Sequence, residues 1–157
     1  QKTAASEFEI LAPVSGELVH LENTNDPAFS SRAVGDGVAV VPQEGTVCAP
    51  VSGTVAALFP TEHALGIMSD DSSAQVMLHI GIDTVKLEGK GFHALVAQGD
   101  HVDAGQPLVE VDFDAVRAAG FDPTVFVIVC ERSENSTLRE HASGPVAVKE
   151  PVVWLSE

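Results

Sequence analysis

The sequence predicts an all-β fold: a compact antiparallel sandwich or barrel-like domain with very little helix. Apolar and polar residues alternate with a period of two along several short segments, which is typical of strands with one buried face. Clusters of Gly, Asp and Ser separate these segments at short intervals, as turns between antiparallel strands do. The chain has 157 residues, 45% of them hydrophobic, so it is long enough to bury a core of its own.

The predicted strands follow from this pattern in chain order. The motif Ala-Pro-Val-Ser-Gly occurs at 12–16 and again at 49–53, and each copy reads as a turn that leads into a strand. We therefore expect a duplicated strand–turn unit, with one strand starting at Glu17. The other expected strands are Gly37–Val41, Thr54–Phe59, Ala64–Met68, Gln75–Ile82, His93–Val96, Pro107–Val111, Thr124–Val129 and Val146–Trp154.

Helix is expected in two short pieces only. Asp112–Ala119 is stopped by Gly120, and Ser136–Ala142 is followed closely by Gly144. Residues 1–8 read as a polar tail or linker, and residues 9–157 as a single domain.

The chain is strongly acidic. It carries 23 Asp and Glu against 8 Lys and Arg, a formal net charge of −15. This charge argues against binding to nucleic acid or to an anionic membrane surface, and it favours a basic partner. No apolar run approaches the length of a membrane span, and we expect a cytoplasmic protein.

The segment 75–85 places an unusual set of side chains on one face of a strand. Its even-numbered positions from 76 to 82 are all apolar and predict the buried face. The opposite face then carries Met77, His79, Gly81 and Asp83. A histidine and a carboxylate thus flank a glycine on the open side of the strand.

A second histidine is predicted to face the first. If residues 70–72 form a three-residue hairpin loop, His63 lies opposite His79, and Leu65 lies opposite Met77. Directly opposed residues have Cβ atoms about 4.5–5.5 Å apart. A slip of one residue would send the pair to opposite faces, so this inference depends on the turn length.

Such a pair allows three interpretations. It can be a packed or solvated pair without a function, or two ligands of a zinc site, although the chain has no HExxH motif, no HxH motif and no cysteine pair. It can also transfer a phosphoryl group, because neutral imidazole is a good nucleophile near pH 7 and a second imidazole can hydrogen-bond the moving group.

Several motifs together resemble the glucose-type enzyme IIA of the bacterial phosphoenolpyruvate-dependent sugar phosphotransferase system. The resemblance extends over nearly the whole chain. Its motifs are Thr61-Glu-His-Ala64, His79-Ile-Gly-Ile-Asp-Thr-Val85, Asp26-Pro-Ala-Phe29, Val34-Gly-Asp-Gly37 and Gly99-Asp-His-Val-Asp-Ala-Gly105. It implies a β-sandwich that takes a phosphoryl group from phosphorylated HPr and passes it to a cysteine of a IIB domain during sugar uptake.

The resemblance also assigns roles to single residues. His79 matches the phosphoacceptor, His63 its stabilising helper, Thr61 the residue that orients His63, and Gly81 the carbonyl that fixes the tautomer of His79. Together with the hairpin geometry it gives an expected partner-binding surface made of Asp26, Phe29, Phe59, Leu65, Met77, Asp83 and Val85. Met77 and Ile80 stand where better-known relatives have phenylalanine.

Two other classes remain as alternatives. A lipoyl- or biotinyl-type carrier would need a modifiable lysine at a hairpin tip, and Lys86 and Lys90 lack that context. A zinc peptidase of the duplicated-hairpin kind would need an HxH ligand pair. No cofactor is expected for the relay, although His63 and His79 could share zinc with a partner, and relatives regulate permeases or kinases through this face. The sequence names neither the sugar nor whether the domain is free or fused.

Overall fold

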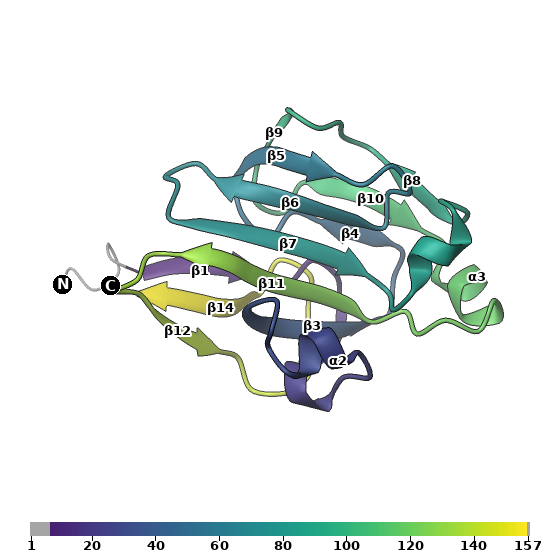
Figure 1. The fold of residues 1–157 in the computed structure, drawn as a ribbon, viewed down its shortest axis with the longest axis horizontal. Coiled ribbons are helices and arrows are strands. Elements are labelled where there is room, and N and C mark those ends of the chain that lie inside the picture. The colour runs from purple at the N-terminus through teal and green to yellow at the C-terminus, as the bar shows by residue number, and fades with distance from the viewer. Residues whose placement is uncertain (1–6, 157) are drawn as a thin grey trace.

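The computed structural model describes residues 7–156, and these form antiparallel sheets, which confirms the predicted all-β sandwich (Figure 1). The largest sheet has the spatial order β13-β2-β3-β11-β7-β6-β5-β9. Its members are β2 (Gly16–His20), β3 (Asp36–Pro42), β5 (Gly53–Leu58), β6 (Ala64–Ser69), β7 (Ala74–Ile80), β9 (His101–Val102), β11 (Val125–Arg132) and β13 (Gly144–Val146).

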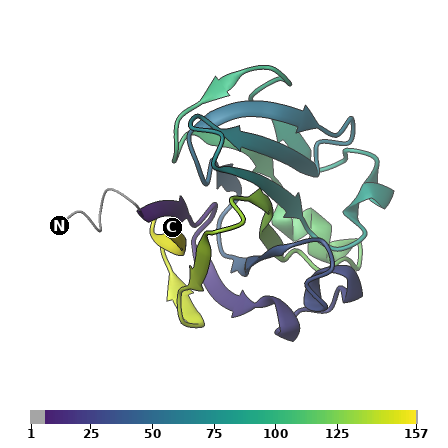
Figure 2. The same cartoon turned by 60° about the vertical axis from the view of Figure 1, so that its left-hand side comes forward.

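Two three-stranded sheets complete the strand architecture. One has the order β4-β10-β8, with β4 (Thr46–Cys48), β8 (Phe92–Ala94) and β10 (Pro107–Val111). The other has the order β1-β14-β12, with β1 (Glu7–Leu11), β12 (Thr137–Glu140) and β14 (Pro151–Ser156). Figure 2 shows β1 beside the yellow C-terminal strands at one side of the molecule.

Helical segments are short, as expected. They are α2 (Pro27–Ser30), α3 (Phe113–Ala118) and two 3-10 turns, η1 (Leu21–Asn23) and η2 (Thr84–Leu87). The helix expected over 112–119 is confirmed as α3, which Asp112 caps by accepting a hydrogen bond from the Ala115 N–H.

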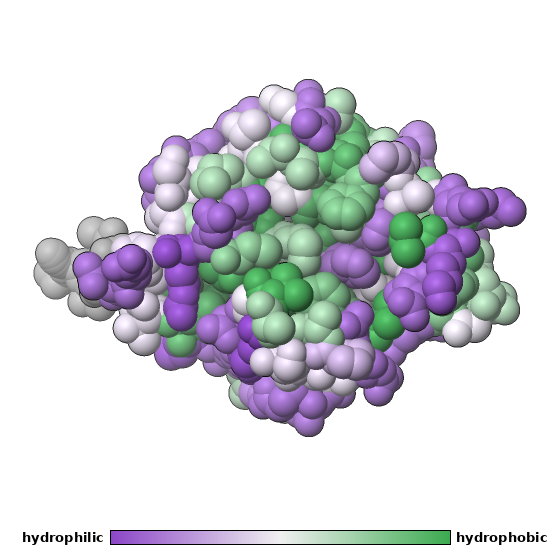
Figure 3. Space-filling model, in the orientation of Figure 1, coloured by the Kyte–Doolittle hydropathy of each residue, from purple (hydrophilic) through white to green (hydrophobic). Residues whose placement is uncertain are grey.

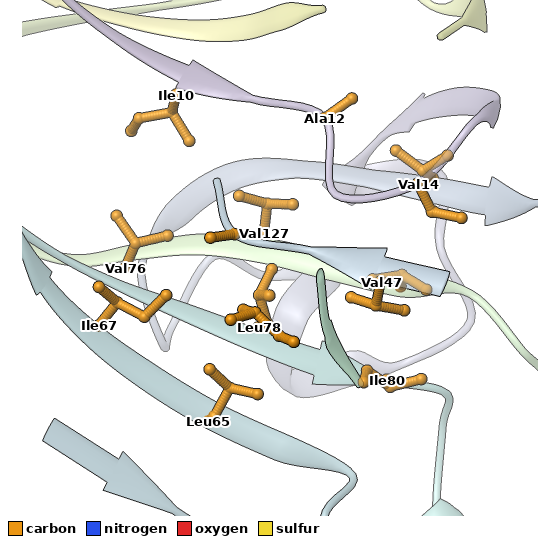
Figure 4. Close-up of a cluster of buried hydrophobic side chains, with 14 of the residues drawn as sticks. Ile10, Ala12, Val14, Val47, Leu65, Ile67, Val76, Leu78, Ile80 and Val127 are labelled. Carbon is orange, nitrogen blue, oxygen red and sulfur yellow. The ribbon is translucent and has the colours of Figure 1, made fainter. Parts of the chain in front are cut away.

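Alternation along the central strands separates a core from an outer face. Val76, Leu78 and Ile80 of β7 are fully buried between the sheets, together with residues of β6 and β11 (Figure 4). The intervening residues of β7, Met77 and His79, point to the outer face of the sheet. On this face Phe126 and Ile128 of the neighbouring strand β11 belong to a second apolar cluster. This second cluster carries the candidate site.

The final glycine of each Ala-Pro-Val-Ser-Gly motif lies against the backbone of a neighbouring strand. Gly16 begins β2 and Gly53 begins β5. A Cβ atom would lie 1.9 Å from the Val41 carbonyl oxygen at Gly16, and 2.1 Å from the Met68 carbonyl oxygen at Gly53. Only glycine therefore allows the backbones to approach this closely at either turn.

The predicted hairpin register is wrong by one residue. Ala64, not His63, lies opposite His79, and Leu65 lies opposite Leu78 rather than Met77. The loop extends over residues 70–73, one residue more than expected, and within it the Asp71 carboxylate accepts hydrogen bonds from the N–H and the hydroxyl of Ser73. Leu65 consequently points into the core and not toward the histidines.

Other boundaries also differ from the sequence predictions. The expected helix over 136–142 is wrong: its centre is strand β12, which pairs with β14. The expected strand over 146–154 is interrupted by the turn at 147–150 and forms parts of β13 and β14. Strand β1 begins at Glu7, so residues 7 and 8 of the expected tail belong to the fold, while residues 1–6 lie outside the described part of the chain.

A histidine pair as the candidate functional site

His79 stands near the end of β7 on the outer face of the large sheet. Its Nδ1 lies 2.8 Å from the Gly81 carbonyl oxygen. A carbonyl oxygen can only accept, so Nδ1 carries the proton and Nε2 keeps its lone pair. No residue in the described range 7–156 bonds Nε2, which leaves it available as a nucleophile.

The expectation that Gly81 and Asp83 continue the open face of the strand is wrong. Strand β7 ends at Ile80, and Gly81 has a φ of 83° in the left-handed region. The chain therefore turns back, which allows the Gly81 carbonyl to reach the ring two residues earlier. Asp83 also has a positive φ, 62°, and precedes η2.

Thr84 stabilises this turn through its side chain. Its hydroxyl donates a hydrogen bond to the Ile80 carbonyl, and the residue is 1% exposed. A Cβ on Gly81 would lie 2.3 Å from Thr84 Cγ2, so the close fit of residues 81 and 84 requires glycine.

His63 reaches the site from a turn and not from a strand. The preceding residue, Glu62, has a φ of 64°, and its carboxylate accepts a hydrogen bond from the Ala94 N–H at 2.6 Å. The His63 carbonyl accepts from the Ile80 N–H at 2.7 Å, and Nδ1 lies 2.6 Å from the Thr61 hydroxyl. Backbone and ring are thus both held, and Nε2 is again the remaining nitrogen.

The two imidazoles form one unit. Their ring centroids are 5.1 Å apart and their planes meet at 85°. Burial lowers the pKa of His63 from 6.5 to about 4, and the neighbouring His79 adds to this shift. Burial also lowers the pKa of His79, against the opposing influence of the Gly81 carbonyl and the carboxylates of Asp26 and Asp83. Both rings are therefore neutral near pH 7.

Aromatic side chains support the pair. Phe29 of α2 packs on His79 with ring centroids 5.3 Å apart, and it stacks on Phe126 of β11 at 4.4 Å. Phe59 lies edge-on to His63 at 5.4 Å. Phe126 and Glu62 were not singled out by sequence reasoning, because an apolar strand residue and a turn glutamate carry no pattern of their own.

The expected partner-binding surface is only partly exposed. Phe29 is 5% exposed and Leu65 is 1% exposed, so these two side chains are buried and not exposed as the expected surface requires. Phe29 instead supports the His79 ring. Phe59 and Val85 are 46% and 49% exposed, and Met77 is partly exposed. Figure 3 shows apolar surface over β6, β7 and β11 with hydrophilic surface around it.

The acids expected at the rim have defined positions. Asp26 caps α2 by accepting a hydrogen bond from the Ala28 N–H at 2.9 Å, and Asp83 lies in the turn between β7 and η2. Arg32, the nearest basic residue before the site in sequence, is held by the carboxylates of Glu22, Asp36 and Glu140. Its guanidinium is thereby committed to a different cluster.

The described residues contain no group of three or more His, Cys, Asp and Glu that could hold a metal ion. His63 and His79 offer two imidazole nitrogens, so zinc at this pair would need ligands from a partner. Over the same residues, no helix is long and apolar enough to cross a membrane.

Fold and site together define a β-sandwich domain with paired imidazoles on one face. The chain belongs to the EIIA 1 family of the phosphoenolpyruvate-dependent sugar phosphotransferase system, whose model matches residues 8–135. The family assignment leaves the lipoyl-type carrier and the zinc peptidase without support.

Individual relatives agree with this assignment. The glucose-specific EIICBA component of Streptococcus pneumoniae is 42% identical over 92% of this chain, and the β-glucoside-specific EIIBCA component of Bacillus subtilis is 42% identical over 94%. The chain covers only 20% and 24% of these two proteins. The glucose permease IIA of Mycoplasma capricolum matches with a TM-score of 0.86 and 34% identity, covering 94% of this chain and 95% of that one.

Proposed function

We propose that this domain is a phosphoryl carrier that accepts a phosphoryl group from phosphorylated HPr on His79 and gives it to a cysteine of a IIB domain. The observation that carries this proposal is the contact between His79 Nδ1 and the Gly81 carbonyl. It selects Nε2 as the nucleophile and holds the ring in one orientation.

The transfer is a displacement at phosphorus. The Nε2 lone pair of His79 forms a new N–P bond while the P–N bond of the donor breaks, and its electron pair returns to the donor ring. The proton on Nδ1 stays in place, so the phosphorylated ring becomes positively charged. The Gly81 carbonyl stabilises that charge, as do the nearby acids Asp26 and Asp83.

His63 serves as the stabiliser of the moving group. A Thr61 hydroxyl that donates to Nδ1 leaves the proton of His63 on Nε2, where it can hydrogen-bond a phosphoryl oxygen. A neutral donor holds the phosphoryl group without the tight ion pair that a guanidinium would form. This suits a carrier, which has to release what it binds.

Partner binding would use both apolar contact and charge, for different purposes. Phe59 and Val85 supply exposed apolar surface and Met77 a partly exposed side chain, while Asp26 and Asp83 supply negative charge close enough to His79 to affect its pKa. Apolar contact adapts to more than one partner, and charge orients a basic partner during encounter. HPr and IIB would therefore use one surface in turn.

The chain spans about a fifth of the length of the curated relatives it matches. The whole relay is therefore part of the proposal: the domain acts in the cytoplasm, free or tethered to a permease, and needs no cofactor. Zinc shared with a partner, and regulation of permeases or kinases through this face, belong to the proposal too. The relatives are named for glucose, β-glucosides and N-acetylglucosamine, so no single sugar follows.

The test is phosphoryl labelling. The domain, enzyme I and HPr are incubated with labelled phosphoenolpyruvate, and the label on the domain is measured. His79→Gln should abolish it, whereas a substitution at His101, a surface histidine paired with Asp70, should not. Label that persists in His79→Gln and maps to His63 or Cys130 would overturn the proposal.

A further inference from the structure

Asp122 precedes β11 and uses both of its carboxylate oxygens. Oδ1 accepts hydrogen bonds from the N–H and the hydroxyl of Thr124, at 2.9 and 2.5 Å. Oδ2 accepts from the Asn25 side-chain amide at 3.0 Å. One carboxylate thus fixes its own turn and joins it to the segment before α2.

The backbone of the same turn holds the loop that follows His79. The Gly81 N–H donates to the Thr124 carbonyl at 2.8 Å, and the Ile82 N–H donates to the Asp122 carbonyl at 2.9 Å. In a planar trans peptide the C=O and the N–H point in opposite directions. Aiming the Ile82 N–H at Asp122 therefore aims the Gly81 carbonyl away from it, and that carbonyl is the partner of His79 Nδ1.

The hydrogen bond between Asp122 and Asn25 connects the same carboxylate to the helix that packs on the His79 ring. Asn25 immediately precedes Asp26, the capping residue of α2, and α2 carries Phe29. Phe29 packs on the His79 ring at 5.3 Å. The Asp122 carboxylate consequently links the carbonyl that bonds the ring to the helix that supports it.

We propose that Asp122 is a positioning residue that fixes the tautomer and orientation of His79 through the Gly81 carbonyl and α2. Its consequence for phosphoryl transfer rests on the proposed function, but its effect on the ring does not. Without the carboxylate the 122–124 turn loosens, the Gly81 carbonyl loses its fixed direction, and the Nδ1 proton redistributes between the two nitrogens.

The chain offers a matched control for this proposal. Asp71 forms the same kind of turn, accepting hydrogen bonds from the N–H and the hydroxyl of Ser73 at 2.9 and 2.6 Å. That turn precedes β7, at the opposite end of the strand from His79. Asp71→Ala and Asp122→Ala remove equivalent turn bonds, so only an effect specific to Asp122 reports positioning.

The decisive readout is the tautomer of His79, measured by nitrogen NMR of the ring in unphosphorylated protein at pH 7.5. Wild type and Asp71→Ala should show Nδ1 protonated, whereas Asp122→Ala should show a mixture with Nε2 protonated. Asp122→Asn should recover most of the wild-type signal, because an amide oxygen can still accept from Thr124. Labelling by phosphorylated HPr should fall about 10- to 100-fold in Asp122→Ala, as expected for a misplaced nucleophile.

Asn25→Ala provides a second variant if Asp122→Ala does not fold, since it removes only the Oδ2 contact. It should shift the tautomer in the same direction by a smaller amount. A wild-type tautomer in Asn25→Ala and in folded Asp122→Ala would overturn the proposal. A shifted tautomer in Asp122→Ala, together with a wild-type domain that HPr does not phosphorylate, would instead overturn the proposed function and leave the positioning role intact.

Discussion

Gly81→Ala tests whether crowding in the turn that follows His79 requires glycine at this position. A left-handed φ of 83° costs a residue with a Cβ about 1–2 kcal/mol. The new Cβ would also lie 2.3 Å from Thr84 Cγ2 and 3.1 Å from the Asp122 carbonyl oxygen. Overpacking of this kind costs about 1–3 kcal/mol. We expect a total loss of about 2–5 kcal/mol in the free energy of unfolding, by addition of the two costs.

Gly99 supplies the control. Its φ is 97°, and a Cβ there would meet no atom of the described residues within 4 Å. Gly99→Ala should therefore lose only the backbone cost, about 1–2 kcal/mol. Any gain from a stiffer unfolded chain is the same in both variants and cancels in the comparison.

A third variant identifies the atom responsible. Thr84→Ser removes Cγ2 but keeps the hydroxyl that donates to the Ile80 carbonyl. Combined with Gly81→Ala, it should recover part of the lost stability in urea unfolding, as a double-mutant cycle. The explanation is refuted if Gly81→Ala loses no more stability than Gly99→Ala, or if Thr84→Ser recovers none of it.

Three further predictions concern the histidine pair and its rim. His63→Gln should slow transfer to IIB by about 10²–10³, as loss of one preorganised donor does, with an unchanged fold by circular dichroism; wild-type rates would remove His63 from the mechanism. Between pH 6.5 and 4 the unfolded state protonates His63 before the folded state does, because its pKa is lowered to about 4. As the pH is lowered through this window, the free energy of unfolding should therefore fall by up to about 3 kcal/mol more in wild type than in His63→Gln. An equal dependence of the free energy of unfolding on pH in the two proteins, measured by urea unfolding, would contradict this. Asp83→Asn, which tolerates the positive φ, should slow phosphorylation by HPr most at low salt; a defect independent of salt would exclude steering.

The fold class was predictable because alternation is a local signal. Strand β7 shows its buried face directly in the sequence, and the repeated turns mark the starts of β2 and β5. The register of the β6–β7 hairpin was not predictable, because residues 70–73 are all small or polar and suit a three-residue turn as well as the longer turn observed. The failed helix over 136–142 shows the same limit, since pairing with β14 overrides local preference there.

The meeting of the histidines was predicted correctly from an incorrect register. Ala64 occupies the position opposite His79, and His63 reaches the ring because Glu62 adopts a left-handed conformation. No sequence pattern signals that turn. Burial of Phe29 was also not predictable, because it depends on how α2 packs against Phe126 on the outer face of the sheet. The Asp122–Pro123–Thr124 turn did carry a local signal, an Asp two residues before a Thr, that sequence reasoning passed over.

The central claim is that the Gly81 carbonyl keeps the proton on Nδ1 of His79 and so directs the phosphoryl group to Nε2. It is tested most directly by phosphorus–nitrogen coupling in the nitrogen-15-labelled domain after phosphorylation by HPr. We predict one phosphorus signal coupled to Nε2 of His79, with Nδ1 still protonated. Coupling to Nδ1 of His79, or to either nitrogen of His63, would contradict the claim.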